Sequence, residues 1–83
     1  MAKVLVVDDE QAITTLLKYN LEKAGYEVKI VNNGNDALDE GLTGKYDFII
    51  LDLMLPGIDG IEVTKRIRQE KITTYILILT AKD

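Results

Sequence analysis

A chain of 83 residues with 47% apolar side chains can bury one small hydrophobic core, which excludes an intrinsically disordered protein. The net charge of −4, with no predicted cluster of Lys and Arg, argues against nucleic acid as a partner. The absence of cysteine excludes disulfides and thiolate metal sites. No apolar run approaches the ~20 residues of a membrane helix, and the run at 4–7 is too short for a signal peptide. We therefore expect a cytoplasmic protein with no membrane partner.

The first half of the chain alternates between strand and helix signals. Residues 4–7 are continuously apolar, which predicts a strand covered on both faces. A predicted helix follows, and its apolar positions at helical spacing are Ile13, Leu16, Leu17, Leu21 and Ala24. Gly25 is well placed to end that helix in a left-handed conformation. The next strand, 28–31, alternates around Lys29, which predicts a place at the edge of the sheet.

The second half repeats the alternation. Asn35 is expected to cap a short helix that runs to about Leu42. After the apolar strand at 48–51, Asp59 is expected to cap a third helix, and the predicted inner face of that helix carries Ile61, Thr64 and Ile67, with Lys65, Arg66 and Arg68 directed outward. A fourth strand is predicted at 75–79. The order βαβαβαβ predicts an α/β fold with a doubly wound, mainly parallel sheet and right-handed crossovers.

Acidic residues follow two of the predicted strands. Asp8, Asp9 and Glu10 come directly after the first strand, and Asp52 comes directly after the third. In open α/β sheets, ligands bind beyond the carboxyl ends of the strands where the winding direction reverses. If the second strand is outermost, the first and third are neighbours. Asp8, Asp9 and Asp52 are then expected to converge at one switch point.

Three converging carboxylates predict a metal site. At about 4 Å and an effective dielectric near 20, each pair of carboxylates costs roughly 4 kcal/mol, which a divalent cation removes. Oxygen ligands favour Mg2+, and Mg2+ held by few carboxylates and completed by phosphate is typical of phosphoryl transfer. Taken singly, acidic residues after strands are often solvated loop residues, but their joint placement favours a site. Thr80 follows the fourth strand, so its hydroxyl is expected at the same edge, although a Thr there is usually structural.

Three segments of the chain resemble known motifs. They are VLVVDDE from Val4, LDLMLPGIDG from Leu51 and LTAKD from Leu79. Together they resemble the N-terminal part of the receiver domain of bacterial two-component response regulators, most closely the class with a winged-helix DNA-binding output domain. The resemblance implies a flavodoxin-like sheet in a signalling domain that controls transcription through its output domain. It implies no enzyme beyond the domain's own phosphorylation and dephosphorylation.

The resemblance also implies a role for individual residues. Asp52 would accept a phosphoryl group from a histidine kinase. Asp9 would bind Mg2+ directly and Asp8 would help, often through water, while the backbone carbonyl of Met54 would be a further ligand. Thr80 would be the switch hydroxyl that turns toward the aspartyl phosphate. The loop after the acceptor would be shaped by Pro56 and Gly60, and also by Gly57.

The family pattern continues past Asp83 with a fourth helix, a fifth strand and a fifth helix. We therefore expect residues 1–83 to form a receiver domain that is incomplete at its C-terminus and truncated after the fourth strand. The fifth strand of the family carries a Lys that contacts the phosphoryl group, and Lys82 is not that residue. The fourth strand would then present an apolar edge through which chains could self-associate.

The acidic residues are also compatible in type with two other classes of function, a Mg2+-dependent phosphohydrolase and an inert fragment. A Mg2+-dependent phosphohydrolase of the haloacid-dehalogenase type needs Asp-x-Asp after its first strand, whereas this chain has Asp8-Asp9. A topoisomerase-primase metal site needs Asp-x-Asp after the later strand, and Met54 stands where the second Asp is required. The remaining alternative is an inert receiver fragment that acts only as a folding or interaction unit. The sequence names neither the cognate kinase nor the output domain.

Overall fold

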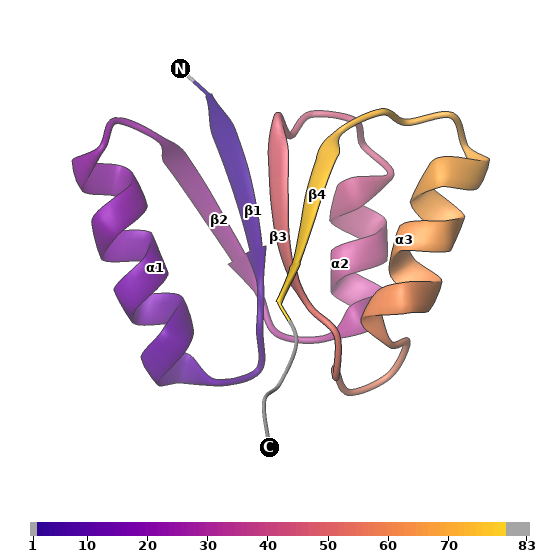
Figure 1. Ribbon diagram of the computed structural model, residues 1–83, viewed down its shortest axis with the longest axis horizontal. Helices are drawn as coiled ribbons and strands as arrows, with labels where there is room; N and C mark the ends of the chain where they lie inside the picture. Colours follow the sequence, from indigo (N-terminus) through magenta and orange to yellow (C-terminus); the bar gives the residue numbers. More distant parts are fainter. Residues whose placement is uncertain (1, 80–83) are drawn as a thin grey trace.

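The computed structural model describes residues 2–79, in which a four-stranded sheet lies between one helix on one face and two helices on the other (Figure 1). In chain order the elements are β1 (Lys3–Val7), α1 (Gln11–Lys23), β2 (Glu27–Val31), α2 (Gly34–Gly41), β3 (Phe48–Asp52), α3 (Gly60–Gln69) and β4 (Tyr75–Leu79). The predicted βαβαβαβ order is thus confirmed. None of the described helices is long and apolar enough to cross a bilayer.

The strands are all parallel, in the order β2-β1-β3-β4. The predicted edge position of β2 is confirmed, and its outward Lys29 is exposed. In the register of the sheet, Val7 of β1 lies beside Leu51 of β3, and Asp52 lies beside Leu79 of β4. This doubly wound order places the carboxyl ends of β1 and β3 next to each other, although Val7 and Asp52 are about 45 residues apart in the chain.

The core has two parts, one on each face of the sheet. Under α2 and α3, the fully buried side chains of the larger cluster include Leu5, Ile49, Leu51, Val63 and Ile67. Under α1 the cluster is smaller and consists of Val4, Val6 and Ile50, with Leu17 and Leu21 packed against it. Full burial of such a side chain contributes roughly 1.5–3 kcal/mol, so the central strands β1 and β3 anchor the fold.

The inner face of α1 differs from the predicted one. Leu17 and Leu21 face the sheet as expected, but the buried residue of the first turns is Thr14, and its hydroxyl donates to the carbonyl of Gln11 at 3.1 Å. Ile13 and Leu16 are 38% and 63% exposed. Thr14 can be buried because its polar group is satisfied within the helix, which leaves the larger apolar residues on the outside. Gly25 has a φ of +98°, as predicted for the end of this helix.

Two details of the later helices are corrected. The N-cap of α2 is Asn33 and not Asn35, because the Asn33 side chain accepts from the backbone N–H of Asp36 at 2.8 Å. Asp59 caps α3 as predicted and accepts from Glu62 N–H at 2.9 Å. The buried face of α3, however, consists of Gly60, Val63 and Ile67, and Ile61 is 58% exposed. The predicted inner face was wrong because a helix of ten residues has more than one set of apolar positions at helical spacing. The outward Lys65, Arg66 and Arg68 are exposed, as expected.

Candidate functional site

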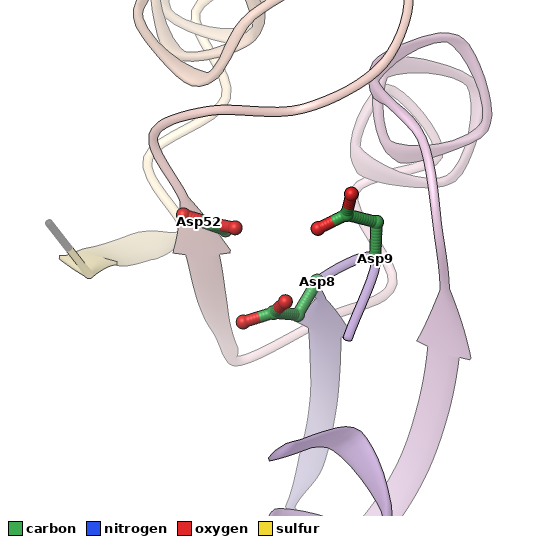
Figure 2. A group of neighbouring side chains, drawn as sticks. All are labelled: Asp8, Asp9 and Asp52. Carbon is green, nitrogen blue, oxygen red and sulfur yellow. The ribbon is translucent and has the colours of Figure 1, made fainter. Parts of the chain in front are cut away.

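Three carboxylates meet at the carboxyl end of the two central strands, as predicted. Asp8 directly follows β1, Asp9 is the next residue, and Asp52 ends β3. Each of the three residues contributes one carboxylate oxygen, and these three oxygens lie within 4.8 Å of one another (Figure 2). The side-by-side register of β1 and β3 carries Asp8 and Asp52 to the same edge of the sheet, and the loop after β1 adds Asp9.

Asp8 is the most enclosed of the three, with 3% of its surface exposed. Its Oδ1 accepts from Glu10 N–H at 2.9 Å, and its backbone N–H donates to the carbonyl of Val31 at 3.3 Å. The side-chain amide of Asn32 donates to the Asp8 carbonyl at 3.1 Å. The two backbone contacts fix Asp8 beside the end of β2, and its carboxylate points to the side of the sheet where Asp52 lies (Figure 2).

Asp52 is half-buried, and its electrostatic surroundings disfavour its charge. Burial raises the pKa of the Asp52 carboxyl, and the nearby carboxylates of Asp8 and Asp9 raise it further. The backbone N–H of Met54, which donates to Asp52 Oδ1 at 3.3 Å, opposes this by lowering the pKa. The net direction is upward, so the site favours neutralisation of the Asp52 charge.

The loop at 53–59 borders the acidic cluster. Its first residue, Leu53, donates to the carbonyl of Leu79 at 3.0 Å and accepts from Gly60 N–H at 2.9 Å. A β-carbon on Gly60 would lie 2.6 Å from the carbonyl oxygen of Asp52, so this position requires glycine. Beside the loop is an open hollow of about 590 Å³, whose lining includes Asp9, Met54 and Ile61. Both Met54 and Ile61 are exposed apolar side chains.

The donor set fits a hard divalent cation. The three carboxylates offer only oxygen atoms, and the three ion pairs found within residues 2–79 involve none of them. Burial is the main cause of the raised pKa of Asp52, and a cation would relieve the repulsion from Asp8 and Asp9 that adds to it. The residues present therefore match the oxygen coordination that Mg2+ requires.

The structure places some of the remaining predicted residues and not others. Met54 lies two residues after Asp52, and its N–H donates to Asp52 Oδ1 at 3.3 Å. Thr80 lies outside the described residues. Sequence reasoning missed Asn32, which holds the Asp8 carbonyl, and a polar residue directly after the second strand could have signalled it. It also missed the buried Gly34, for which the sequence gives no local signal.

Comparison with known proteins agrees with this geometry. The family described as response regulator receiver domain matches residues 4–83. The chain is 57% identical over 81 residues to the alkaline phosphatase synthesis transcriptional regulatory protein PhoP of Bacillus subtilis, covering 98% of this chain and 34% of PhoP. It is 51% identical over 80 residues to the transcriptional regulatory protein ResD of the same organism, covering 96% of this chain and 33% of ResD. The chain thus spans about a third of the length of these curated relatives.

Solved structures show the same architecture. The receiver domain of the Francisella response regulator 1452 superposes with a TM-score of 0.93 at 37% identity, over all of this chain and 69% of that one. The response regulator TrrA of Thermotoga maritima, crystallised in complex with Mg2+-BeF, gives a TM-score of 0.90 at 46% identity over 72% of its chain. TrrA was also solved in complex with the histidine kinase ThkA, with a TM-score of 0.89. The flavodoxin-like prediction is confirmed, and the chain belongs to the response regulator receiver domain family of two-component signalling.

Proposed function

We propose that this chain is a phosphoacceptor, in which Asp52 takes a phosphoryl group from a histidine kinase in a Mg2+-dependent reaction. The observation that carries the proposal is the convergence of Asp8, Asp9 and Asp52 at the end of the central strands. In the transfer, the bond between phosphorus and the kinase histidine nitrogen breaks as a bond to an Asp52 oxygen forms. The phosphorylated domain then changes conformation and controls an output domain.

Each residue of the site has a distinct task in this proposal. Asp9 binds the cation directly, Asp8 supports it, and the carbonyl of Met54 completes the protein's share of the ligands. Mg2+, when bound, neutralises charge on the carboxylates and on the incoming phosphoryl group. The N–H of Met54 orients the Asp52 carboxylate for attack. Thr80 is proposed as the hydroxyl that turns toward the aspartyl phosphate.

The proposed chemistry has a direct test. The purified chain is treated with a small phosphodonor such as acetyl phosphate, with and without Mg2+, and its mass is measured. We expect one added phosphoryl group, mapped to Asp52 and absent from Asp52→Asn. A phosphoryl group mapped to Asp8 or Asp9 would contradict the assignment. No modification of the wild-type chain would instead favour the alternative of an inert receiver fragment.

Docking of the kinase is proposed at the first turns of α1. Within residues 2–79 Ile13 and Leu16 are exposed near the acidic site, which favours docking over the alternative that they are core residues. TrrA, a structural neighbour, was solved in complex with a histidine kinase, which supports a kinase partner. Ile13→Ala should slow transfer from the kinase more than it slows phosphorylation by acetyl phosphate. Lys65→Ala, an exposed change on α3, serves as the control. Equal loss with both donors would contradict docking at this position.

We also propose that the 83-residue chain self-associates through β4. Among the described residues β4 pairs only with β3, and the exposed fractions of Tyr75 and Leu77 on this strand are 60% and 42%. Unpaired backbone groups beside apolar side chains are a template for pairing with another chain. Sedimentation velocity should detect oligomers that Leu77→Lys disrupts and Leu42→Lys, a matched change on another surface, does not. A monomer at all concentrations would refute this proposal. The extent of the receiver domain beyond residue 83 stays a prediction.

A further inference from the structure

The loop at 53–59 packs against the first turn of α2. The N–H of Gly34, the first residue of α2, donates to the carbonyl of Pro56 at 3.0 Å. A β-carbon built on Gly34 would lie 1.6 Å from the carbonyl oxygen of Ile58 and 2.5 Å from its carbonyl carbon. The backbone of Gly34 has no left-handed conformation, so this close approach alone requires glycine.

Neighbouring residues extend the same contact. Gly57 has a φ of +78°, and a β-carbon there would lie 2.9 Å from the side-chain oxygen of Asn35. Asn33 caps the turn by accepting from Asp36 N–H at 2.8 Å, which fixes the turn that touches the loop. The middle of the loop therefore rests on a capped helix turn that comes from a distant part of the chain.

The supported loop carries a part of the proposed site at its start. Leu53 is held by the carbonyl of Leu79, and the next residue, Met54, directs its N–H at Asp52. The middle of the loop is fixed by the hydrogen bond from Gly34 N–H of α2 to the carbonyl of Pro56. To restore an ordinary contact of 3.4 Å from 1.6 Å, the Ile58 carbonyl would have to move by about 1.8 Å if Gly34 gained a methyl group. Displacements near 1 Å at a positioned group can cost on the order of 100-fold in rate.

We infer that Gly34 is a positioning residue for the acceptor site, which it serves by letting the first turn of α2 fix the loop at 53–59. The inference rests on the proposed function, because the site that is positioned is the proposed Mg2+ and phosphoryl site. Gly34 contacts neither the carboxylates nor the ligands. It acts through the backbone of Pro56 and Ile58, and so controls where Met54 presents its backbone to the cation.

The test compares two identical substitutions in one helix. Gly34→Ala adds a methyl group against the loop backbone, whereas Gly41→Ala adds one at the other end of α2, 2.5 Å from the flexible Cδ1 of Ile67. Both variants and the wild-type chain are titrated with MgCl2 by isothermal calorimetry at a temperature where circular dichroism shows each to be folded. We expect the Kd for Mg2+ to rise on the order of tenfold in Gly34→Ala, which is typical when a residue that orients a metal ligand is lost. We expect it to stay near the wild-type value in Gly41→Ala.

The outcomes separate the inference from the proposed function. A wild-type chain that binds no Mg2+ would overturn the proposed function. Wild-type binding with an equal Kd in Gly34→Ala, or an equal rise in Gly41→Ala, would overturn the inference alone. If Gly34→Ala does not fold, the same MgCl2 titration is made on Asn33→Ala, which removes the N-cap of α2. Its control is Thr43→Ala, beyond the other end of α2. Weaker Mg2+ binding in Asn33→Ala only would support the inference, and an unchanged Kd would overturn it.

Discussion

Charged side chains lie close to like charges at one end of the parallel sheet and close to complementary partners at the other. At the carboxyl end, Asp8, Asp9 and Asp52 bring like charges within 4.8 Å of one another. At the amino end, charged and polar groups meet complementary partners. There the backbone N–H of Lys3 donates to Asp47 at 2.8 Å, Lys3 Nζ lies 3.8 Å from Glu27, and the Tyr46 hydroxyl donates to Glu40 at 2.6 Å.

The contrast separates residues kept for stability from residues kept for chemistry. Complementary pairs at the amino end add modestly to the free energy of unfolding, because most are exposed to solvent. The like charges of the carboxylates at the other end reduce the free energy of unfolding. Local rules of stability fail most often at functional sites, and the cluster of like charges at the carboxyl end is such a failure.

The largest expected effect tests the carboxyl end. Asp9→Ala removes the proposed direct ligand and its charge, so measurable Mg2+ binding should be lost. Asp39→Ala removes an exposed carboxylate outside the cluster and should leave the titration unchanged. Calorimetric titration with MgCl2 provides the measurement. If Asp9→Ala titrated like the wild-type chain, the three carboxylates would not be a metal site.

The next effect concerns stability without metal. Because the pKa of Asp52 is raised in the fold, its carboxylate form destabilises the folded state above that pKa, and this cost disappears as the pH falls through it. Asp52→Asn should therefore raise the free energy of unfolding at neutral pH, because it removes the unfavourable charge. The gain should shrink in acid, and Mg2+ should stabilise the wild-type chain more than the variant. Urea melts across pH would show this, and a variant less stable than wild type at neutral pH would contradict it.

A smaller effect of the opposite sign is expected at the amino end. Burial, and then the hydrogen bond to Glu40, raise the pKa of Tyr46 from 10.0 to about 12, and the same hydrogen bond lowers the pKa of Glu40. Tyr46→Phe should lower stability at neutral pH. In the wild-type chain this contribution is fully present below pH 10, is lost as the pH rises toward about 12, and is also lost in acid as Glu40 becomes protonated. Thermal melts of both proteins, compared across pH, measure it, and a pH-independent difference would refute the linkage.

The smallest effect concerns backbone strain at the amino end of the sheet. Lys71, in the loop between α3 and β4, has a φ of +62°, which costs a side chain about 1 kcal/mol or more. Lys71→Gly should raise the free energy of unfolding by about 0.5 kcal/mol, since the greater chain entropy of glycine offsets part of the relief. Lys65→Gly inside α3 should instead lower it by about 1 kcal/mol. Loss of stability in both variants would show that Lys71 is not strained.

Patterns within one element and the meeting of strand ends were predictable from the sequence, whereas the detailed contacts of helices and loops were not. The alternation around Lys29 predicted the edge position of β2, and the acidic residues after two strands predicted the cluster, because strand order places those ends together. The helix faces were less certain, since Thr14 and not Ile13 is buried in α1. Asn33 could not be told from Asn35 as a cap. The role of Gly34 depends on a backbone approach from residue 58, which no local pattern encodes.

The strand order also sets the sequence of events in folding. A chain synthesised only as far as Val31 can pair β1 with β2, but the other side of β1 is still open, and the strand that carries Asp52 must arrive there from later in the chain. Pairing of distant strands is slow, because the entropy of loop closure is lost before the contacts form. Asp8 and Asp9 therefore meet Asp52 only after β3 has docked. If Asp52 is the phosphoacceptor, as proposed, its phosphorylation would mark a chain whose central strands have already assembled, and only folded molecules would receive the signal.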